Sequence, residues 1–428
     1  MLKSSLLALV IVCTLMSALA LSATTDTSRT NSLFQFAVPV DHITIQGPLR
    51  DRLLRNYDRL ERSEYEPAQV FRLDANNQQW PGDYAGRTIL ALANLQRITG
   101  RKSRYLDTLL AELPQHLNER GYMGAISSGI DEQQLAGNGW LVSGLLAAHE
   151  VTGNAQALAI ARGIVTNLFL PTRAHFASYP CTPETRTANS GGASGTRVGT
   201  HGEWQLSTDI GCAFIMLEGL VDAYATFGGD DLKTLIDEMC TAFATIDLEG
   251  TSVQLHATLT AIRQLLHYHD LTGDPTILAL AQHVYDNYRV KAMTENFANY
   301  NWYNRPTWTE PCAIVDSFIV ATSLWRKTGD PSYLEDAHAI YFNALGYAQK
   351  PHGGFGCDNC VGAEEPVLFN KVYDVTWCCN MRGAVGLSHA ADFTYLQMAD
   401  ALVLPFYFDS TALVTFPNGH MTVSETTA

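Results

Sequence analysis

Thiol and carboxylate side chains gather in one stretch of this 428-residue chain. Glu310-Pro311-Cys312, Cys357-Asp358-Asn359-Cys360 and Cys378-Cys379 place five thiols and a carboxylate within 70 residues. Thiolates and a carboxylate together suit the tetrahedral preference of Zn²⁺, and adjacent cysteines reach one metal more easily than they bond to each other. We therefore expect a zinc site, with its ligands still open among these residues. Two disulfides and a buried thiol are the alternative.

An aromatic segment lies just before this cluster. It reads Tyr300-Asn301-Trp302-Tyr303-Asn304-Arg305-Pro306-Thr307-Trp308 and follows Glu295. Sugar sites pack the C–H faces of a ring on flat aromatic side chains and bond its hydroxyls through amides, so Trp302 and Trp308 are candidate sugar contacts. Asp83, in a turn with Trp80 and Tyr84, has a similar setting. A packed aromatic cluster and a helix-capping aspartate are the structural alternatives.

One histidine stands out by its position. His256 opens an apolar helical stretch at the same relative place where Cys312 opens the next one, so it is a candidate site residue, with a core or capping histidine as the alternative.

The motifs of other chemistries are absent from the sequence: it has no phosphate-binding Walker loop, no dinucleotide fingerprint after a strand, no serine-hydrolase elbow and no H-E-x-x-H.

A repeated helical hairpin is the element that must position these residues. Glycine-containing turns separate paired helical stretches at Thr99-Gly100, Thr152-Gly153, Gly228-Gly229, Thr272-Gly273 and Thr328-Gly329. Glycine allows the left-handed helix exit, and in two hairpins an Asp-Pro pair then caps and starts the following helix. A sixth stretch covers residues 383–397. The pattern predicts an all-α chain that closes into an (α/α)6 barrel, with an open solenoid as the alternative.

The rest of the chain is divided on the same basis. Residues 21–74 are expected to form an N-terminal extension with a first helix, and residues 75–400 the barrel. Two segments, 179–202 and 350–377, are expected to be long loops, which often carry function at the mouth of a barrel, with a flexible linker as the alternative for 179–202. Strand-like residues over 401–415 predict a late hairpin, so that 401–428 is the start of a β region that is apparently truncated.

Composition and the N-terminus indicate the compartment. The chain is 46% hydrophobic and carries a net charge of −15, which indicates a globular protein and excludes nucleic acid and anionic membranes as main ligands. Lys3, an apolar run over 6–16 and Ser17-Ala18-Leu19-Ala20 predict a signal peptide at 1–20, hence a secreted or periplasmic protein. No later apolar run reaches the length of a membrane anchor, and nothing specifies the oligomeric state.

Several motifs occur in a characteristic order along the second half of the chain. They are Glu310-Pro311-Cys312-Ala313, Thr328-Gly329-Asp330, Tyr333-Leu334, Tyr341-Phe342-Asn343 and Cys378-Cys379-Asn380 with Arg382. In this order and spacing the chain resembles glycoside hydrolase family 127, the β-L-arabinofuranosidases and their relatives, over roughly residues 75 to 405. The resemblance implies an (α/α)6 barrel with one bound zinc, which in the family is followed by β-sandwich domains.

The resemblance also implies roles for single residues. Glu310, Cys312, Cys378 and Cys379 match the zinc ligands, and Cys378 falls where the family has its nucleophile. Glu295, followed by Asn296 and Phe297, matches the acid/base glutamate, and His256 matches a sugar-contacting histidine. A zinc-held thiolate is deprotonated at neutral pH and can displace a sugar while Glu295 protonates the leaving oxygen. Two such displacements retain the configuration of the sugar.

Some positions depart from the family. His338 stands where a sugar-binding carboxylate is usual and Gly139 where a histidine is usual, while Cys357 and Cys360 occupy a loop that more often supplies an aromatic residue. These two cysteines could be alternative zinc ligands, form a second metal site or form a disulfide. The sequence thus predicts an exported retaining glycoside hydrolase acting on β-L-arabinofuranosyl or related sugars of oligo- or polysaccharides. The alternative is a non-catalytic glycan-binding toroid with a structural zinc.

Overall fold

A computed structural model describes residues 36–37, 42–76, 79–186, 194–360, 374–398, 401–416 and 418–427. The predicted signal peptide at 1–20 lies outside these residues. None of the helices in the described ranges has both the length and the apolar character needed to cross a membrane.

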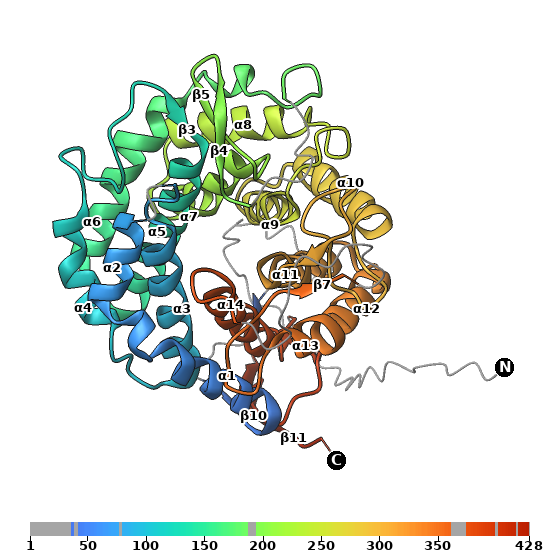
Figure 1. The fold of residues 1–428 in the computed structure, drawn as a ribbon. Helices are drawn as coiled ribbons and strands as arrows, with labels where there is room; N and C mark the ends of the chain where they lie inside the picture. Colours follow the sequence, from blue (N-terminus) through green and yellow to red (C-terminus); the bar gives the residue numbers. More distant parts are fainter. Residues whose placement is uncertain are drawn as a thin grey trace, which may run out of the picture.

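A closed ring of parallel inner helices forms the centre of the molecule. Each packs on the next in chain order, and the last packs on the first, so the ring closes (Figure 1). Within the described residues its members are α3 (Asp83–Thr99), α5 (Glu132–Thr152), α7 (Leu217–Phe227), α9 (Leu255–Thr272), α11 (Pro311–Thr328) and α14 (Cys379–Asp392). The predicted (α/α)6 barrel is therefore confirmed, and closure of the ring excludes the open solenoid.

Outer helices connect consecutive inner ones. They are α4 (Leu106–Glu112), α6 (Ala155–Ile164), α8 (Asp230–Phe243), α10 (Pro275–Lys291) and α12 (Pro331–Ala339), with the short α13 (Gly346–Ala348) after α12. The gap between α14 and α3 is covered by α1 (Gly47–Leu60), and α2 (Pro67–Asn76) packs on α3. In α1, the Nδ2 atom of Asn56 donates to the carbonyls of Gly353 and Asn380 at 2.9 and 3.1 Å. The N-terminal segment thus completes the barrel.

The predicted turn chemistry is present at the hairpins. Gly100, Gly153, Gly273 and Gly329 adopt left-handed φ values of 68 to 74°, and each N–H closes the preceding helix by bonding to the carbonyl four residues back. The Asp274 and Asp330 side chains accept from backbone N–H groups at the start of the next helix. These glycines therefore determine where α3, α5, α9 and α11 end.

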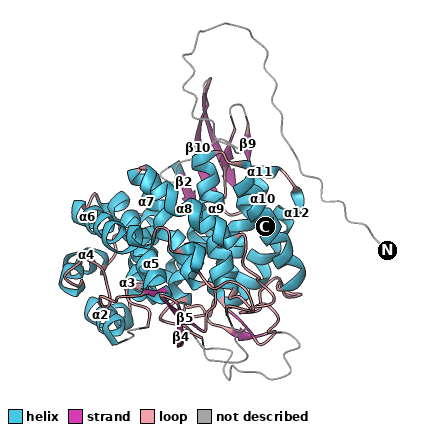
Figure 2. Cartoon of the chain, turned by 90° about the horizontal axis from the view of Figure 1, so that it is seen from above, coloured by secondary structure: helices cyan, strands magenta, loops and turns pink. Residues whose placement is uncertain are grey.

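The alternation of inner and outer helices along the chain sets the direction in which the inner helices run. All inner helices run the same way, so their N-termini meet at one end of the barrel. At that end lies a sheet of β3 (Ile130–Asp131), β5 (Trp204–Ser207) and β4 (Arg197–His201), in which β3 and β5 are parallel. Figure 2 shows β4 and β5 at one end of the molecule and β2, β9 and β10 at the other.

The segment 179–202 is only partly the surface loop that the sequence predicts. Tyr179 and Arg186 are buried, and Arg186 forms an ion pair with the buried carboxylate of Glu132 at the start of α5. An unpaired buried carboxylate is costly, and Arg186 supplies the charge that Glu132 needs. This segment is therefore anchored to the barrel up to residue 186, and its residues 187–193 lie outside the described part.

The late hairpin predicted over 401–415 is wrong in its pairing. Strand β9 (Leu402–Val403) pairs with β8 (Leu396–Gln397), which also pairs with β1 (Phe36–Ala37). The hairpin is formed instead by β10 (Ser410–Phe416) and β11 (Gly419–Glu425), and β2 (Ile43–Ile45) adds to β10. Pro405 lies between β9 and β10, and a proline offers no N–H to a ladder. Strands β6 (Trp308–Thr309) and β7 (Asp358–Asn359) pair beside α11.

Close packing of α3 on α5 depends on two glycines, which gives a test of the fold. A Cβ on Gly86 would overlap the backbone of Trp140 and Leu141, and one on Gly144 would overlap the carbonyl of Gly86. We expect Gly86→Ala to lower the free energy of unfolding by about 1–3 kcal/mol, measured by urea denaturation. Gly163→Ala in α6 is the control: its Cβ meets no atom within 4 Å, so a gain of about 0.4–1 kcal/mol is expected. Equal effects would contradict this packing.

Candidate metal centre

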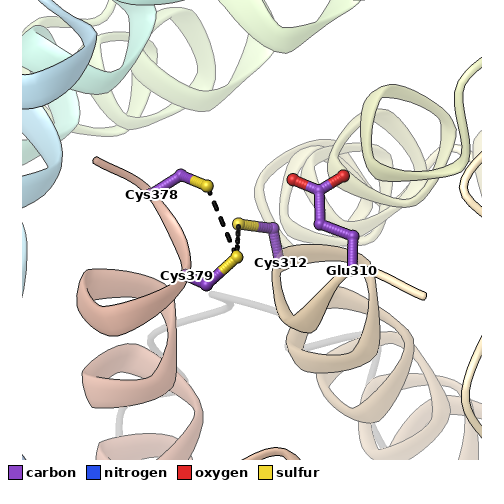
Figure 3. Close-up of side chains that lie close together, drawn as sticks. All are labelled: Glu310, Cys312, Cys378 and Cys379. Atoms are coloured by element: carbon purple, nitrogen blue, oxygen red, sulfur yellow. Dashed lines mark hydrogen bonds between the residues drawn. The ribbon is translucent and has the colours of Figure 1, made fainter. Parts of the chain in front are cut away.

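Four side chains predicted as zinc ligands lie together at the starts of α11 and α14. The ligand atoms of Glu310, Cys312, Cys378 and Cys379 are all within 4.8 Å of one another (Figure 3). The Sγ atom of Cys379 is 3.4 Å from that of Cys378 and 3.9 Å from that of Cys312. In a tetrahedral site with Zn–S bonds of about 2.3 Å, sulfur atoms are about 3.8 Å apart. The group therefore has the spacing of a single metal site.

Helix termini explain why these residues meet. Glu310 precedes Pro311, the first residue of α11, and Cys378 precedes the first residue of α14. Because inner helices are parallel neighbours, thiols 67 positions apart in the chain come into contact. The N-terminus of a helix has unpaired N–H groups and a positive dipole end, both of which favour negative charge. Thiolates and a carboxylate are therefore well placed there.

Burial disfavours negative charge on this group when no cation is bound. Cys312, Cys379 and Glu310 are buried, whereas Cys378 is half-buried. Burial raises the pKa of the Cys312 and Cys379 thiols well above its usual value, and it raises the pKa of Glu310 to about 7. The Oε2 atom of Glu310 is buried and has no hydrogen-bond partner among the described residues. Three thiols, a carboxylate and this orphaned oxygen together fit a bound zinc ion.

The guanidinium groups of two arginines lie beside the cysteines. The Nη1 atom of Arg87 lies 3.9 Å from the Sγ atom of Cys312, and its Nε atom donates to Asp83 at 2.8 Å. The guanidinium groups of Arg87 and Arg382 stack on the ring of Trp140 at 4.1 and 4.6 Å from its centroid. Asp83, predicted as a sugar contact, is thus brought to the centre through its pair with Arg87. The positive charge of Arg87 favours a thiolate at Cys312.

His256 also lies where the sequence predicts, beside the metal group. Its Nδ1 atom is 4.0 Å from Oε1 of Glu310, and its ring stacks on Trp140 with centroids 5.8 Å apart. Burial lowers the pKa of His256 well below its usual value, and the nearby arginines, with Arg87 first among them, lower it further. The imidazole is therefore neutral at neutral pH and offers one donor and one acceptor.

An ion-pair network behind the cluster fixes these side chains. Asp316, fully buried on α11, accepts hydrogen bonds from Arg263 and Arg382 and from the hydroxyl of Thr260. Its Oδ2 atom also lies 3.5 Å from Nε2 of His256. The network joins α9, α11 and α14. Sequence reasoning missed Arg87, Trp140 and Asp316 as site residues, because none belongs to a short motif with a recognised spacing. Arg382 was part of a family motif but was given no role in the site.

The aromatic segment is only partly accessible. Trp302 is 1% exposed: it meets the edge of Trp308 with centroids 5.6 Å apart and is covered by the guanidinium of Arg305 at 4.1 Å. Trp302 is therefore part of a packed aromatic cluster, which is the structural alternative given for it above. Trp308 is half-buried in β6, two residues before Glu310. Contact of either ring with a sugar stays a prediction.

Glu295 and His338 lie apart from the four-ligand group. Glu295 is exposed, on a turn closed by the pairing of Met293 with Asn299, and it is not one of the four residues whose ligand atoms lie together. This turn belongs to the connection from α10 to α11, at the end where the inner helices begin. His338 is on the outer helix α12, where its Nε2 atom is 2.7 Å from the carbonyl oxygen of Pro405. The structure thus ties His338 to the β9–β10 connection.

The two remaining cysteines of the cluster point to different places. The Sγ atom of Cys357 lies 3.8 Å from that of Cys379, whereas the Sγ atom of Cys360 lies 3.7 Å from the carbonyl oxygen of Asn299. All eight described cysteines are free thiols. The C-x-x-C sequence therefore does not form a disulfide here, and only its first cysteine reaches the metal group.

Solved structures with this fold are known. A GH127 β-arabinofuranosidase is 12% identical over 94% of this chain and 68% of that chain, with a TM-score of 0.67. A GH127 β-L-arabinofuranosidase from Geobacillus stearothermophilus T6 is 13% identical over 90% of this chain and 70% of that chain, with a TM-score of 0.61. A cellobiose 2-epimerase from Spirochaeta thermophila, 14% identical over 81% of this chain and 99% of that chain, has a TM-score of 0.51.

These likenesses confirm, at the level of the fold, the resemblance to family 127 that the motifs indicate. No protein-family model and no curated protein sequence matches the chain.

Proposed function

We propose that this protein is a retaining glycoside hydrolase in which Cys378, held by zinc, is the nucleophile. The observation that carries the proposal is the group of Glu310, Cys312, Cys378 and Cys379 at the N-terminal end of an (α/α)6 barrel. The fold is shared with GH127 β-arabinofuranosidases, and it is also shared with an epimerase. The choice of hydrolysis therefore rests on the thiols rather than on the fold.

Exposure distinguishes Cys378 from its neighbours. It is half-buried, whereas Cys312 and Cys379 are buried, so it is the thiol that a substrate can reach. It also stands at the N-terminus of α14, where its backbone carbonyl accepts from Met381 and Arg382. A bound zinc ion would supply the positive charge that keeps these thiols deprotonated at neutral pH. Cys378 can then act as a nucleophile without a separate base.

The reaction proceeds by two displacements at the anomeric carbon. The Sγ atom of Cys378 forms a bond to this carbon while the glycosidic C–O bond breaks, and Glu295 gives its proton to the departing oxygen. Glu295, now a carboxylate, takes a proton from a water molecule that attacks the same carbon and releases Cys378. Each step inverts the carbon, so the configuration is retained. The exposed position of Glu295 on the α10–α11 connection supports access to substrate and water.

The substrate class follows from the family resemblance and from the groups near Cys378. We propose β-L-arabinofuranosyl or related sugars at the end of an oligo- or polysaccharide. Neutral His256 and the carboxylate of Asp83 are available to hydroxyl groups, and Trp308 offers a partly exposed ring. With the predicted signal peptide, the protein would act as a secreted or periplasmic enzyme. A glycan-binding toroid with a structural zinc remains the competing function, and the following experiments separate the two.

Replacing the nucleophile is the direct test. We expect Cys378→Ser to abolish hydrolysis of aryl β-L-arabinofuranosides and related arylglycosides, because serine lacks the thiolate, while sugar binding measured by calorimetry persists. Cys181→Ser is the control, since Cys181 is a free, half-buried thiol outside the four-ligand group that contacts the hydroxyl of Thr245. Hydrolysis by Cys378→Ser at the wild-type rate would contradict the mechanism. Binding without any hydrolysis by the wild-type protein would support the toroid.

A second test concerns the acid/base residue. We expect Glu295→Gln to lower kcat by about 10²–10⁴-fold for substrates with poor leaving groups, and much less for nitrophenyl glycosides, whose oxygen leaves without a proton. The control is Glu335→Gln, which changes an exposed glutamate on the outer helix α12. A loss of activity that is independent of the leaving group would assign Glu295 a different role.

A further inference from the structure

A fourth thiol lies at ligand spacing from one cysteine of the metal group but outside the group. The Sγ atom of Cys357 is 3.8 Å from that of Cys379, close to the edge of about 3.8 Å of a tetrahedral zinc site. Its ligand atom is not among those that all lie within 4.8 Å of one another, so four other donors already complete the site. Cys357 is buried, with 5% of its surface exposed. The protein thus holds one more thiol than a tetrahedral site needs.

Backbone contacts fix this thiol in place. The N–H of Gly356 donates to the carbonyl of Ala348 at 3.2 Å, and the N–H of Phe355 donates to the side chain of Asn380 at 2.5 Å. The N–H of Val375 donates in turn to the carbonyl of Phe355 at 2.9 Å. Asn380 directly follows Cys379 and is fully buried. The segment that carries Cys357 is therefore fastened to the segment that carries the metal ligands.

We propose that Cys357 is a reserve ligand, which takes the place of Cys378 on the metal while Cys378 carries the sugar. This inference rests on the proposed function. When the C–S bond forms and the glycosidic C–O bond breaks, the Sγ atom of Cys378 changes from a thiolate to a neutral thioether, which is a weaker ligand. Cys357, whose Sγ atom lies 3.8 Å from that of Cys379, would then replace Cys378 as a sulfur donor, its proton passing to water, while Glu310, Cys312 and Cys379 would remain as the other ligands. Hydrolysis of the C–S bond would restore the thiolate of Cys378, and the proton would return to Cys357.

The structure offers one simpler role for this thiol, which the test must separate. The S–H group of Cys357 could serve only to donate a hydrogen bond to the Cys379 sulfur. Serine distinguishes the roles, because a hydroxyl donates a hydrogen bond but does not replace a thiolate as a soft ligand. Cys360 supplies the matched control: it is equally buried, three residues away, and its Sγ atom faces the carbonyl of Asn299.

The experiment removes Cys378 and asks what holds the metal. Zinc affinity is measured by competition with a chromophoric chelator for Cys378→Ala, for Cys378→Ala/Cys357→Ser and for Cys378→Ala/Cys360→Ser. Cobalt is then used as a probe, since its sulfur-to-metal absorption grows with the number of thiolates bound. We expect Cys378→Ala and the Cys360 double variant to bind zinc alike. The Cys357 double variant should bind more than about 100-fold more weakly, beyond the 10–100-fold that loss of an outer hydrogen bond costs. In the cobalt-loaded Cys357 double variant, the sulfur-to-metal absorption should be lower by the contribution of one bound thiolate.

Each result has a defined meaning. Equal zinc affinity and equal cobalt bands in the two double variants would overturn the reserve ligand and leave the proposed function intact. Failure of the wild-type protein to bind zinc would overturn the proposed function and the reserve ligand together. Circular dichroism of the metal-free variants confirms that each is folded. Single Cys357→Ser should keep wild-type zinc binding, because its four primary ligands are unchanged; loss of zinc there would contradict a reserve role.

Discussion

The meeting of the N-termini of α11 and α14 is the constraint on which the candidate site depends. Closure of the barrel makes these two inner helices parallel neighbours, and Pro311 and Cys379 fix the points at which they begin. Two helix ends with unpaired N–H groups then face the same small space. Glu310 and Cys312 come from one end and Cys378 and Cys379 from the other, so neither helix alone carries the complete ligand set.

Charge balance in this space explains the residues around it. Buried thiols and a buried carboxylate resist ionisation, and a cation reverses this preference. Arg87 provides part of that positive charge at Cys312. Behind the cluster, Asp316 pairs with both Arg263 and Arg382, and Glu218 also pairs with Arg263. The hydrogen bonds of Asp316 join α9, α11 and α14. Of the four candidate ligands, Cys378 is the one that is only half-buried.

The fold could be predicted from the sequence because it depends on local signals, such as the Gly-Asp-Pro turns that set the ends of α9 and α11. The clustered cysteines and Glu310 indicated a metal site but left its ligands open, and the set of four came from the family resemblance. What could not be predicted depends on contacts between distant segments. Trp140 and Asp316 look like ordinary core residues until the ring closes around them. The pairing of β10 with β2, the burial of Trp302 and the separation of Cys357 from Cys360 follow likewise from tertiary packing.

The most direct measurement is the zinc content of the full chain, purified without chelator, with free thiols counted by alkylation and mass spectrometry in the same sample. We expect about one zinc per chain, with Cys312, Cys378 and Cys379 protected from alkylation until the metal is removed. Absence of zinc, with these cysteines joined in disulfides, would contradict the proposed mechanism, because Cys378 would then be neither held by a metal nor available as a nucleophile.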